Sequence, residues 1–174
     1  MAKKIRDGFS QTVRTDYLDK NEYPASLNYI YSVETGVKSL RGKLTRLVSM
    51  CPRTWIVLVG YSQGATVVGD TIDIYSTQLS STVKARIKAA ILLGDPRFRA
   101  NQSYSAGTYD RTRSGAYPRP AGAFGGMASR VRSYCNRLDM FCQNNLFGGS
   151  AAEQAHGDYA KYASAAFTFA KSRY

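Results

Sequence analysis

The sequence predicts an α/β domain built around a mainly parallel sheet, and two buried strands with a helix between them are the main evidence. Residues 54–60 and 87–94 are short, largely apolar runs without polar alternation, which is typical of strands covered on both faces. A helical pattern extends from about Gln63 to Leu79 between them. Strand, helix and strand in this order predict a right-handed parallel crossover.

Two helical patterns precede the first of these strands. Apolar side chains recur every four residues across 5–18, which predicts a surface helix packed on a flat layer. Residues 21–26 interrupt this pattern and include the next candidate strand. A second apolar stripe follows Ser32, which we interpret as the helix cap, and Cys51-Pro52 ends it.

The rest of the chain alternates long connections with short regular elements. Residues 95–129 are rich in Gly, Pro, Ser, Arg and Tyr and are too long for an ordinary connection, so we expect a surface excursion. A short strand is expected at 131–135, a second loop at 136–156 and a closing helix at 159–170. The sequence contains no internal repeat and no second domain, so a single domain is expected over residues 1–174.

The composition narrows the classes of function. The chain has 44% apolar residues and a net charge of +12, but its Lys and Arg residues are spread along the whole length, so nucleic-acid binding is not expected. No apolar run approaches the roughly 18 residues of a transmembrane helix, and the amino terminus lacks the apolar region of an export signal. The basic surface is either simply solvated or attracts an anionic polymer, cell wall or lipid face.

A candidate nucleophile lies directly after the first buried strand. Gly60-Tyr61-Ser62-Gln63-Gly64 has the Gly-x-Ser-x-Gly spacing of a nucleophile elbow and stands between a strand and a helix. Glycine on both sides would let Ser62 adopt strained dihedral angles, with its hydroxyl raised over the sheet. The alternative is a glycine-rich strand-to-helix turn with an incidental serine.

A serine nucleophile needs a base, and the chain contains one histidine, His156, just before the last helical pattern. In α/β-hydrolases the acid follows the nucleophile and precedes the histidine in the chain. Asp139 fits this order and would fix the tautomer of the imidazole. Asp158 is a rival but stands too close to His156 for the usual layout.

Asp95 and Asp110 precede the last predicted strand and fit the order less well. The Asp95-Pro96 pair is interpreted as a turn at a strand end. The alternative for Asp139 is an ordinary aspartate of a surface loop.

Together these residues resemble the cutinase family, small lidless α/β-hydrolases that cleave carboxylic esters. The matching segments are Tyr23-Pro24-Ala25-Ser26, Cys51-Pro52, 60–64, Gly94-Asp95-Pro96-Arg97-Phe98, 134–142 and Ala155-His156, with versions most similar to the actinobacterial branch. The resemblance implies a three-layer α/β-hydrolase fold with a doubly wound, mainly parallel sheet and no lid.

The resemblance also implies roles for particular residues. Ser62, Asp139 and His156 would form the catalytic triad, and the backbone N–H of Gln63 would be one donor of the oxyanion hole. A disulfide would join Cys135 to Cys142.

The sequence departs from the family pattern at its amino terminus. Members begin with a strand and an Arg-Gly-Ser/Thr-type loop that supplies the second oxyanion donor, and Cys51 would pair with a cysteine near that strand. Neither the strand nor its cysteine is present here. We therefore expect an amino-terminally truncated domain.

The leading hypothesis is a secreted, monomeric serine carboxylesterase that needs no cofactor or metal. Its substrates would be polyesters, acylated polysaccharides or lipid esters, cleaved through an acyl-enzyme. A phage-type or envelope mycolyl esterase is the nearest alternative. A non-catalytic cationic module that binds the cell envelope is the alternative from another class.

Overall fold

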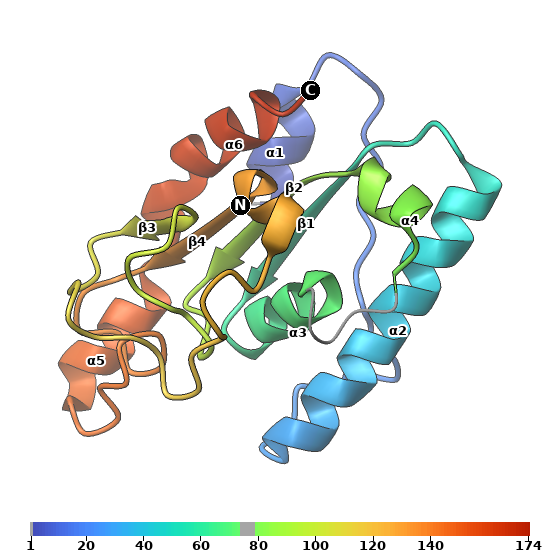
Figure 1. Cartoon of the computed structure of the whole chain (residues 1–174). Coiled ribbons are helices and arrows are strands. Elements are labelled where there is room, and N and C mark those ends of the chain that lie inside the picture. The colour runs from blue at the N-terminus through green and yellow to red at the C-terminus, as the bar shows by residue number, and fades with distance from the viewer. Residues whose placement is uncertain (1, 74–78) are drawn as a thin grey trace.

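A parallel sheet lies at the centre of the protein in the computed structural model, which describes residues 2–73 and 79–174 (Figure 1). Within those residues the sheet has four strands in the order β1-β2-β4-β3, and every neighbouring pair is parallel. The strands are β1 (Ile56–Tyr61), β2 (Ile87–Leu93), β3 (Ser105–Gly107) and β4 (Val131–Cys135). The strands predicted at 54–60, 87–94 and 131–135 are thus confirmed, with small shifts at their ends.

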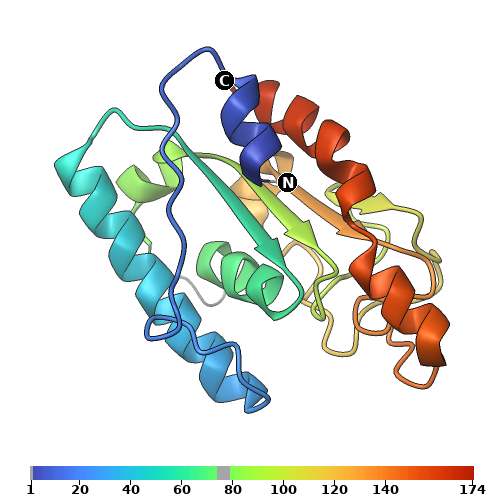
Figure 2. The same ribbon diagram turned by 180° about the vertical axis from the view of Figure 1, so that it is seen from behind.

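Helices cover both faces of this sheet. One face packs against α2 (Tyr29–Met50), α3 (Gln63–Ile72), α4 (Ser81–Arg86) and the 3₁₀ helix η1 (Gly125–Arg130). The other face packs against α6 (Ala163–Lys171), and α1 (Ala2–Gly8) lies beside α6 (Figure 2). The remaining helices are α5 (Gly149–Gly157) and the 3₁₀ helix η2 (Ala160–Tyr162). The three-layer, doubly wound α/β architecture is therefore confirmed.

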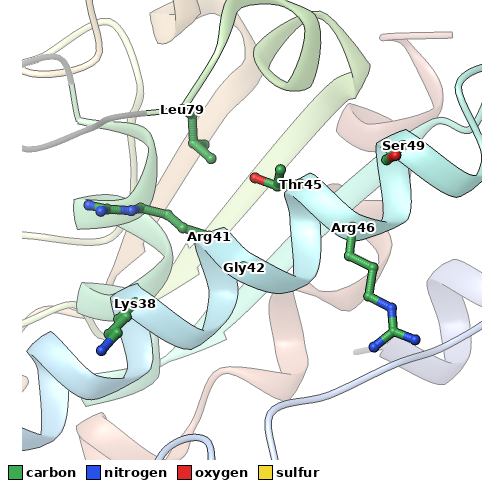
Figure 3. A pocket seen from close by; sticks show the side chains of 7 residues that line it. All are labelled: Lys38, Arg41, Gly42, Thr45, Arg46, Ser49 and Leu79. Carbon is green, nitrogen blue, oxygen red and sulfur yellow. The ribbon is translucent and has the colours of Figure 1, made fainter.

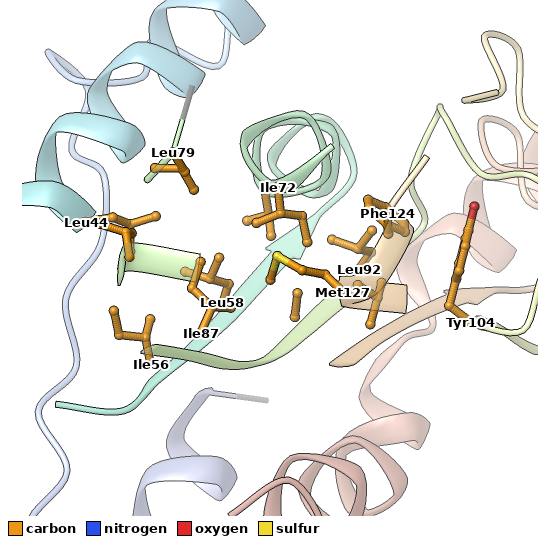
Figure 4. Close-up of a cluster of buried hydrophobic side chains, with 14 of the residues drawn as sticks. Leu44, Ile56, Leu58, Ile72, Leu79, Ile87, Leu92, Tyr104, Phe124 and Met127 are labelled. Carbon is orange, nitrogen blue, oxygen red and sulfur yellow. The ribbon is translucent and has the colours of Figure 1, made fainter. Parts of the chain in front are cut away.

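Each face of the sheet has its own apolar core, because alternate strand residues point to opposite sides. Ile56 and Leu58 of β1 join the core beneath α2 and α3, whereas Val57 and Val59 pack on the α6 side. The larger core is shown in Figure 4 and includes Leu44, Ile56, Leu58, Ile72, Leu79, Ile87, Leu92, Tyr104, Phe124 and Met127. Burial of each large side chain contributes about 1.5–3 kcal/mol, so these two cores hold the layers together.

The first predicted helix is wrong in length. Helix α1 ends at Gly8, and residues 9–28 have neither helix nor strand. Phe9 packs against the apolar core on the α6 side of the sheet and on the rings of Phe167 and Tyr174, but Tyr17, further along the predicted stripe, is 76% exposed. The part of the stripe that has no apolar layer beneath it gains little from being helical.

The candidate strand at 21–26 is also not observed. The Asp19 carboxylate accepts hydrogen bonds from the backbone N–H groups of Asn21 and Glu22, and this turn takes the place of extended pairing. Helix α2 then begins at Tyr29, one turn before the predicted cap at Ser32. Ser32 is a buried residue of the helix, and its hydroxyl serves a different partner, described below.

Four further expectations need correction. Residues 95–129 are not only a surface excursion, because they form β3 and η1 and bury Phe98 and Phe124. The loop expected at 136–156 contains α5, and the closing helix begins with η2. The helix expected to reach Leu79 ends at Ile72, and residues 74–78 lie outside the described part of the chain.

Candidate active site

Ser62 stands at a sharp turn between the end of β1 and the start of α3. Its φ of 53° and ψ of −126° place a non-glycine residue in a sparsely populated backbone conformation. The Ser62 N–H donates to the Leu93 carbonyl at the end of β2 (2.8 Å), and the Ser62 carbonyl accepts from the N–H of Ala65 (2.9 Å). These bonds hold the serine at the carboxyl edge of the two strands.

Glycine is needed on one side of this turn. A Cβ atom at Gly60 would lie 2.4 Å from the Gly64 carbonyl oxygen, which no side chain tolerates, whereas a Cβ atom at Gly64 would meet nothing within 4 Å. The expectation that both glycines make room for Ser62 is therefore correct for Gly60 and wrong for Gly64. Close approach of backbone to backbone is the reason at Gly60.

His156 lies in the last turn of α5, rather than in a loop, and reaches Ser62 with one ring nitrogen. Its Nε2 is 2.9 Å from Ser62 Oγ, and its Nδ1 is 2.9 Å from Asp139 Oδ2. The residue is only 9% exposed. With Nδ1–H donating to the carboxylate, Nε2 presents its lone pair to the serine hydroxyl.

Two aromatic side chains fix the imidazole between them. Tyr61 stacks on it with ring centroids 5.1 Å apart, and Phe141 meets it edge-on at 4.7 Å. The Tyr61 hydroxyl also donates to the His156 backbone carbonyl (2.9 Å). At Gly94, where φ is +60°, a Cβ atom would lie 3.0 Å from His156 Cε1, so a larger residue would push against the ring.

Asp139 is fully buried, and both of its carboxylate oxygens are hydrogen-bonded. Oδ1 accepts from the N–H groups of Phe141 and Cys142, each at 2.8 Å, and Oδ2 accepts from His156 and from the Tyr159 hydroxyl (2.7 Å). Burial alone would raise the pKa of Asp139, but the bond and charge of His156 and the other donors outweigh it, so the pKa is lowered.

The rival carboxylates lie elsewhere. Asp158 is on the surface, where it pairs with Lys161 at 2.9 Å. Asp110 accepts from the hydroxyl and the N–H of Thr112. Asp95 is buried, but in a separate ion-pair network. Of the aspartates considered from the sequence, the structure brings Asp139 to the imidazole.

The disulfide between Cys135 and Cys142 is present, and both cysteines are fully buried. It closes the loop that contains Asp139, immediately after β4. Cys51 is a free, exposed thiol at the end of α2.

Gln63 is the first residue of α3, where a helix leaves its backbone N–H without an intrahelical partner. Its side chain is held in place, because its Oε1 accepts from the Ser32 hydroxyl (2.7 Å) and its Nε2 donates to the Ser26 carbonyl (3.1 Å). The backbone N–H of Gln63 therefore lies directly beside Ser62 in the first turn of α3.

A buried ion-pair network behind the serine was not foreseen. Arg119 is fully buried, donates to the carboxylates of Asp70 and Asp95, and also bonds the Thr66 carbonyl of α3 (3.2 Å). Burial would lower the pKa of Arg119, but the two carboxylates reverse this and raise it. Arg97 adds a second cation on Asp70 at 2.8 Å. Arg119 comes from the excursion, whose composition gave no sign of a core residue.

A shallow hollow beside α2 is shown in Figure 3 and contains no predicted site residue. It is lined by Lys38, Arg41, Gly42, Thr45, Arg46, Ser49 and Leu79. Within residues 2–73 and 79–174, no group of three or more His, Cys, Asp or Glu side chains could hold a metal ion. Over the same residues, no helix is both long enough and apolar enough to cross a membrane.

Comparisons with known proteins agree on one family. The sequence model for cutinases matches residues 1–174. Acetylxylan esterase 2 of Talaromyces purpureogenus is 38% identical in an alignment of 156 positions that covers 84% of this chain and 64% of that protein. Cutinase 11 of Verticillium dahliae is 32% identical in an alignment of 157 positions that covers 84% of this chain and 51% of that protein. This chain thus spans about half to two thirds of the length of these relatives.

A solved structure agrees over nearly the whole chain. An iodinated complex of acetyl xylan esterase is similar, with a TM-score of 0.81 and 32% sequence identity, and the match covers 99% of this chain and 87% of that one.

Proposed function

Because this chain belongs to the cutinase family, we propose that it is a carboxylic ester hydrolase that uses Ser62 as nucleophile, His156 as base and Asp139 as the orienting acid. The observation that supports this most is the continuous chain of two 2.9 Å contacts from Ser62 Oγ through the imidazole to Asp139. A serine, a histidine and a buried carboxylate in this order are the parts that acyl transfer to a hydroxyl requires.

In the proposed reaction, His156 Nε2 removes the hydroxyl proton as Ser62 Oγ attacks the ester carbonyl carbon. The resulting imidazolium is stabilised by Asp139 and returns its proton to the leaving alcohol when the C–O bond of the ester breaks. A water molecule, activated by the same imidazole, then attacks the acyl-enzyme and releases the carboxylic acid. Each half-reaction begins and ends with a neutral imidazole.

Negative charge on the carbonyl oxygen needs donors. We assign the Gln63 N–H as one of them, because it begins α3, where the helix dipole also favours a negative charge. Removing one such donor typically costs about 10²–10³ in turnover. The side-chain bonds of Gln63 to Ser32 and Ser26 hold this peptide in place.

For the substrate we propose short acyl esters, with acetyl groups on a polysaccharide foremost. The similarity to acetylxylan esterase 2 favours this choice. Ser62 is partly exposed and therefore open to a bulky alcohol portion, and Leu27, Ile30 and Tyr31 stand exposed where α2 begins, close to the segment bonded to Gln63. The buried disulfide favours an oxidising compartment, so we also propose that the enzyme acts outside the cell.

Hydrolysis of p-nitrophenyl esters from acetate to palmitate, together with acetate release from acetylated xylan, tests this proposal. The wild-type chain should hydrolyse acetate and butyrate esters fastest, and Ser62→Ala should lose the activity. Preference for palmitate would refute the proposed substrate, and equal rates for wild type and Ser62→Ala would refute the nucleophile.

A further inference from the structure

Tyr159 connects the proposed acid to the loop that carries it. The residue lies just after α5 and is 3% exposed. Its hydroxyl is 2.7 Å from Asp139 Oδ2 and 3.0 Å from the backbone nitrogen of Asn136, and it touches Cys142 Sγ at 3.3 Å. None of the sequence patterns pointed to it.

The direction of the Tyr159 hydroxyl proton follows from its neighbours. The Asn136 N–H can only donate, so the phenolic oxygen accepts there. The Cys142 sulfur belongs to a disulfide and has no proton to give. The single O–H proton therefore points to Asp139. Burial, followed by the charge of Asp139, raises the pKa of Tyr159, which keeps this proton on the phenol.

The oxygen that receives this proton is the same one that faces the histidine. Asp139 Oδ2 accepts from both Tyr159 and His156 Nδ1, whereas Oδ1 is occupied by two backbone N–H groups. We propose that Tyr159 is a positioning residue that sets the basicity of His156 through Asp139. Its O–H draws negative charge away from Oδ2 and so weakens the stabilisation that the carboxylate gives to the protonated imidazole. This inference rests on the proposed catalytic role of the triad.

Several elements pack on the imidazole, and each contributes a group that faces it. Tyr61 from β1 stacks on the ring, and Ser62 faces Nε2. Asp139 comes from the loop after β4, and Tyr162 from η2 lies behind Tyr159 with ring centroids 6.0 Å apart. Among these, Tyr159 and His156 are the side chains that share one oxygen of Asp139, so a change at residue 159 acts directly on the His156–Asp139 bond.

The single histidine of the chain allows a direct test, because its ring signals in an NMR titration are unambiguous. In Tyr159→Phe the carboxylate keeps its full charge for the imidazolium, so the titration midpoint of His156 should rise by about half a pH unit. Tyr162→Phe is the matched control, since it removes a part-buried hydroxyl bond to the side chain of Asn136 (2.8 Å). Its midpoint should equal that of the wild type.

A variant that preserves the shape of the ring guards against misfolding. Tyr159→3-fluorotyrosine is a stronger donor of nearly equal size, so it should move the midpoint in the opposite direction, to lower pH. An unchanged midpoint in both residue 159 variants, or an equal shift in Tyr162→Phe, would overturn the inference.

These midpoints belong to the resting protein and can be measured whether or not an ester is cleaved. Failure of the proposed function is detected separately. In that case the wild type and Ser62→Ala would hydrolyse esters at the same rate. If the triad acts as proposed, the acid limb of the kcat/KM profile of Tyr159→Phe should move up by the same amount as the midpoint. An acid limb that stays in place while the midpoint moves would contradict the link from Tyr159 to catalysis.

Discussion

Asp139 accepts four hydrogen bonds, two at each carboxylate oxygen, in a position closed to solvent. Two come from backbone N–H groups of its own disulfide-closed loop, so the loop itself determines where the carboxylate stands. A buried carboxylate is costly unless its oxygens are bonded. These four bonds lower the pKa of the buried carboxyl group and so keep it ionised beside the imidazole.

Replacement of Asp139 should be far more damaging than replacement of Asp158, the aspartate close to His156 in sequence. Asp139→Asn keeps the shape but gives the imidazole the wrong partner, and we expect kcat to fall by about 10³–10⁴. Asp158→Asn, which alters only a surface pair with Lys161, should stay within about twofold of the wild type. Steady-state kinetics on a p-nitrophenyl ester decide the point, and the reverse order of effects would identify Asp158 as the acid.

The lowered pKa of Asp139 also predicts how stability depends on pH. A carboxyl group has a pKa near 3.9 in an unfolded chain, and the folded-state value of Asp139 lies below its ordinary value. Its contribution to the free energy of unfolding is thus complete above the unfolded value and is lost as the pH falls through the folded one. Urea unfolding between about pH 2 and 5 should therefore show a shallower loss for Asp139→Asn. Parallel curves for the two proteins would be inconsistent with this role.

Individual site residues could be predicted from the sequence where a motif specifies both the residue type and its place relative to a strand or helix. The elbow spacing, the single histidine and the chain order were enough to pair Ser62 with His156 and Asp139. The contacts of Tyr159 and Arg119 with carboxylates could not be predicted. A tyrosine in a predicted apolar helix is usually a packing residue, and an arginine in a Gly- and Pro-rich segment is usually exposed. Only the three-dimensional structure brings them to a carboxylate.

Among the elements, α3 is the part whose position matters most for the proposed mechanism, because it begins beside Ser62. The Ser62 N–H is bonded to Leu93 at the end of β2, and Arg119 ties the Thr66 carbonyl of α3 to the carboxylates of Asp70 and Asp95. The Thr66 hydroxyl also donates to Asp95 (2.9 Å). The excursion after β2 thus supports the helix from behind.

Removal of the buried guanidinium should cost more than removal of the exposed one. Arg119→Met leaves the fully buried Asp95 without its cation, and we expect a loss of about 3–5 kcal/mol in the free energy of unfolding. Arg97→Met alters a pair to Asp70 whose cation is 29% exposed, so its loss should be about 1 kcal/mol. Urea denaturation measures both variants, and equal losses would show that burial does not govern this network.

The two glycines of the elbow offer a second comparison. Gly60→Ala drives a methyl group into the Gly64 carbonyl and should cost about 1–3 kcal/mol or more. Gly64→Ala meets no neighbour within 4 Å and lies inside α3, where alanine is the better helix former, so its melting temperature should be equal or higher. Thermal melts in which Gly64→Ala is the less stable variant would contradict the geometry of the turn.

The ends of helices and strands were predicted less well than the buried strands themselves. The buried strands were predictable because short, largely apolar runs without polar alternation are typical of strands covered on both faces. The helix expected over 5–18 ends at Gly8, and the far end of its apolar stripe, at Tyr17, is exposed to solvent. Helix α5 escaped notice because residues 149–157 are mostly small and polar and carry no apolar period. The spacing of apolar residues reveals a helix or strand only when one of its faces is buried. A helix that buries few apolar side chains therefore leaves no clear pattern in the sequence.

The whole molecule places its chemistry at one edge of the sheet. Ser62 follows β1, Gly94 follows β2, and the Asp139 loop follows β4, so the carboxyl ends of three parallel strands position the proposed nucleophile and the groups around its proposed base. This edge is where ligands bind in open α/β sheets generally. Fold class and the edge that carries the site could both be inferred from the order of strands, helices and motifs. The exact sheet order and the short strand β3 within the excursion required the structure.

The most direct test of the proposed mechanism is covalent labelling with a fluorophosphonate, followed by intact-mass measurement and peptide mapping. The wild type should gain a single adduct on Ser62, because the imidazole at 2.9 Å makes this hydroxyl the reactive one. Ser62→Ala should gain none, and Asp139→Asn should react far more slowly than Asp158→Asn. A folded wild-type protein that remains unlabelled, or that is labelled at another residue, would contradict the central claim.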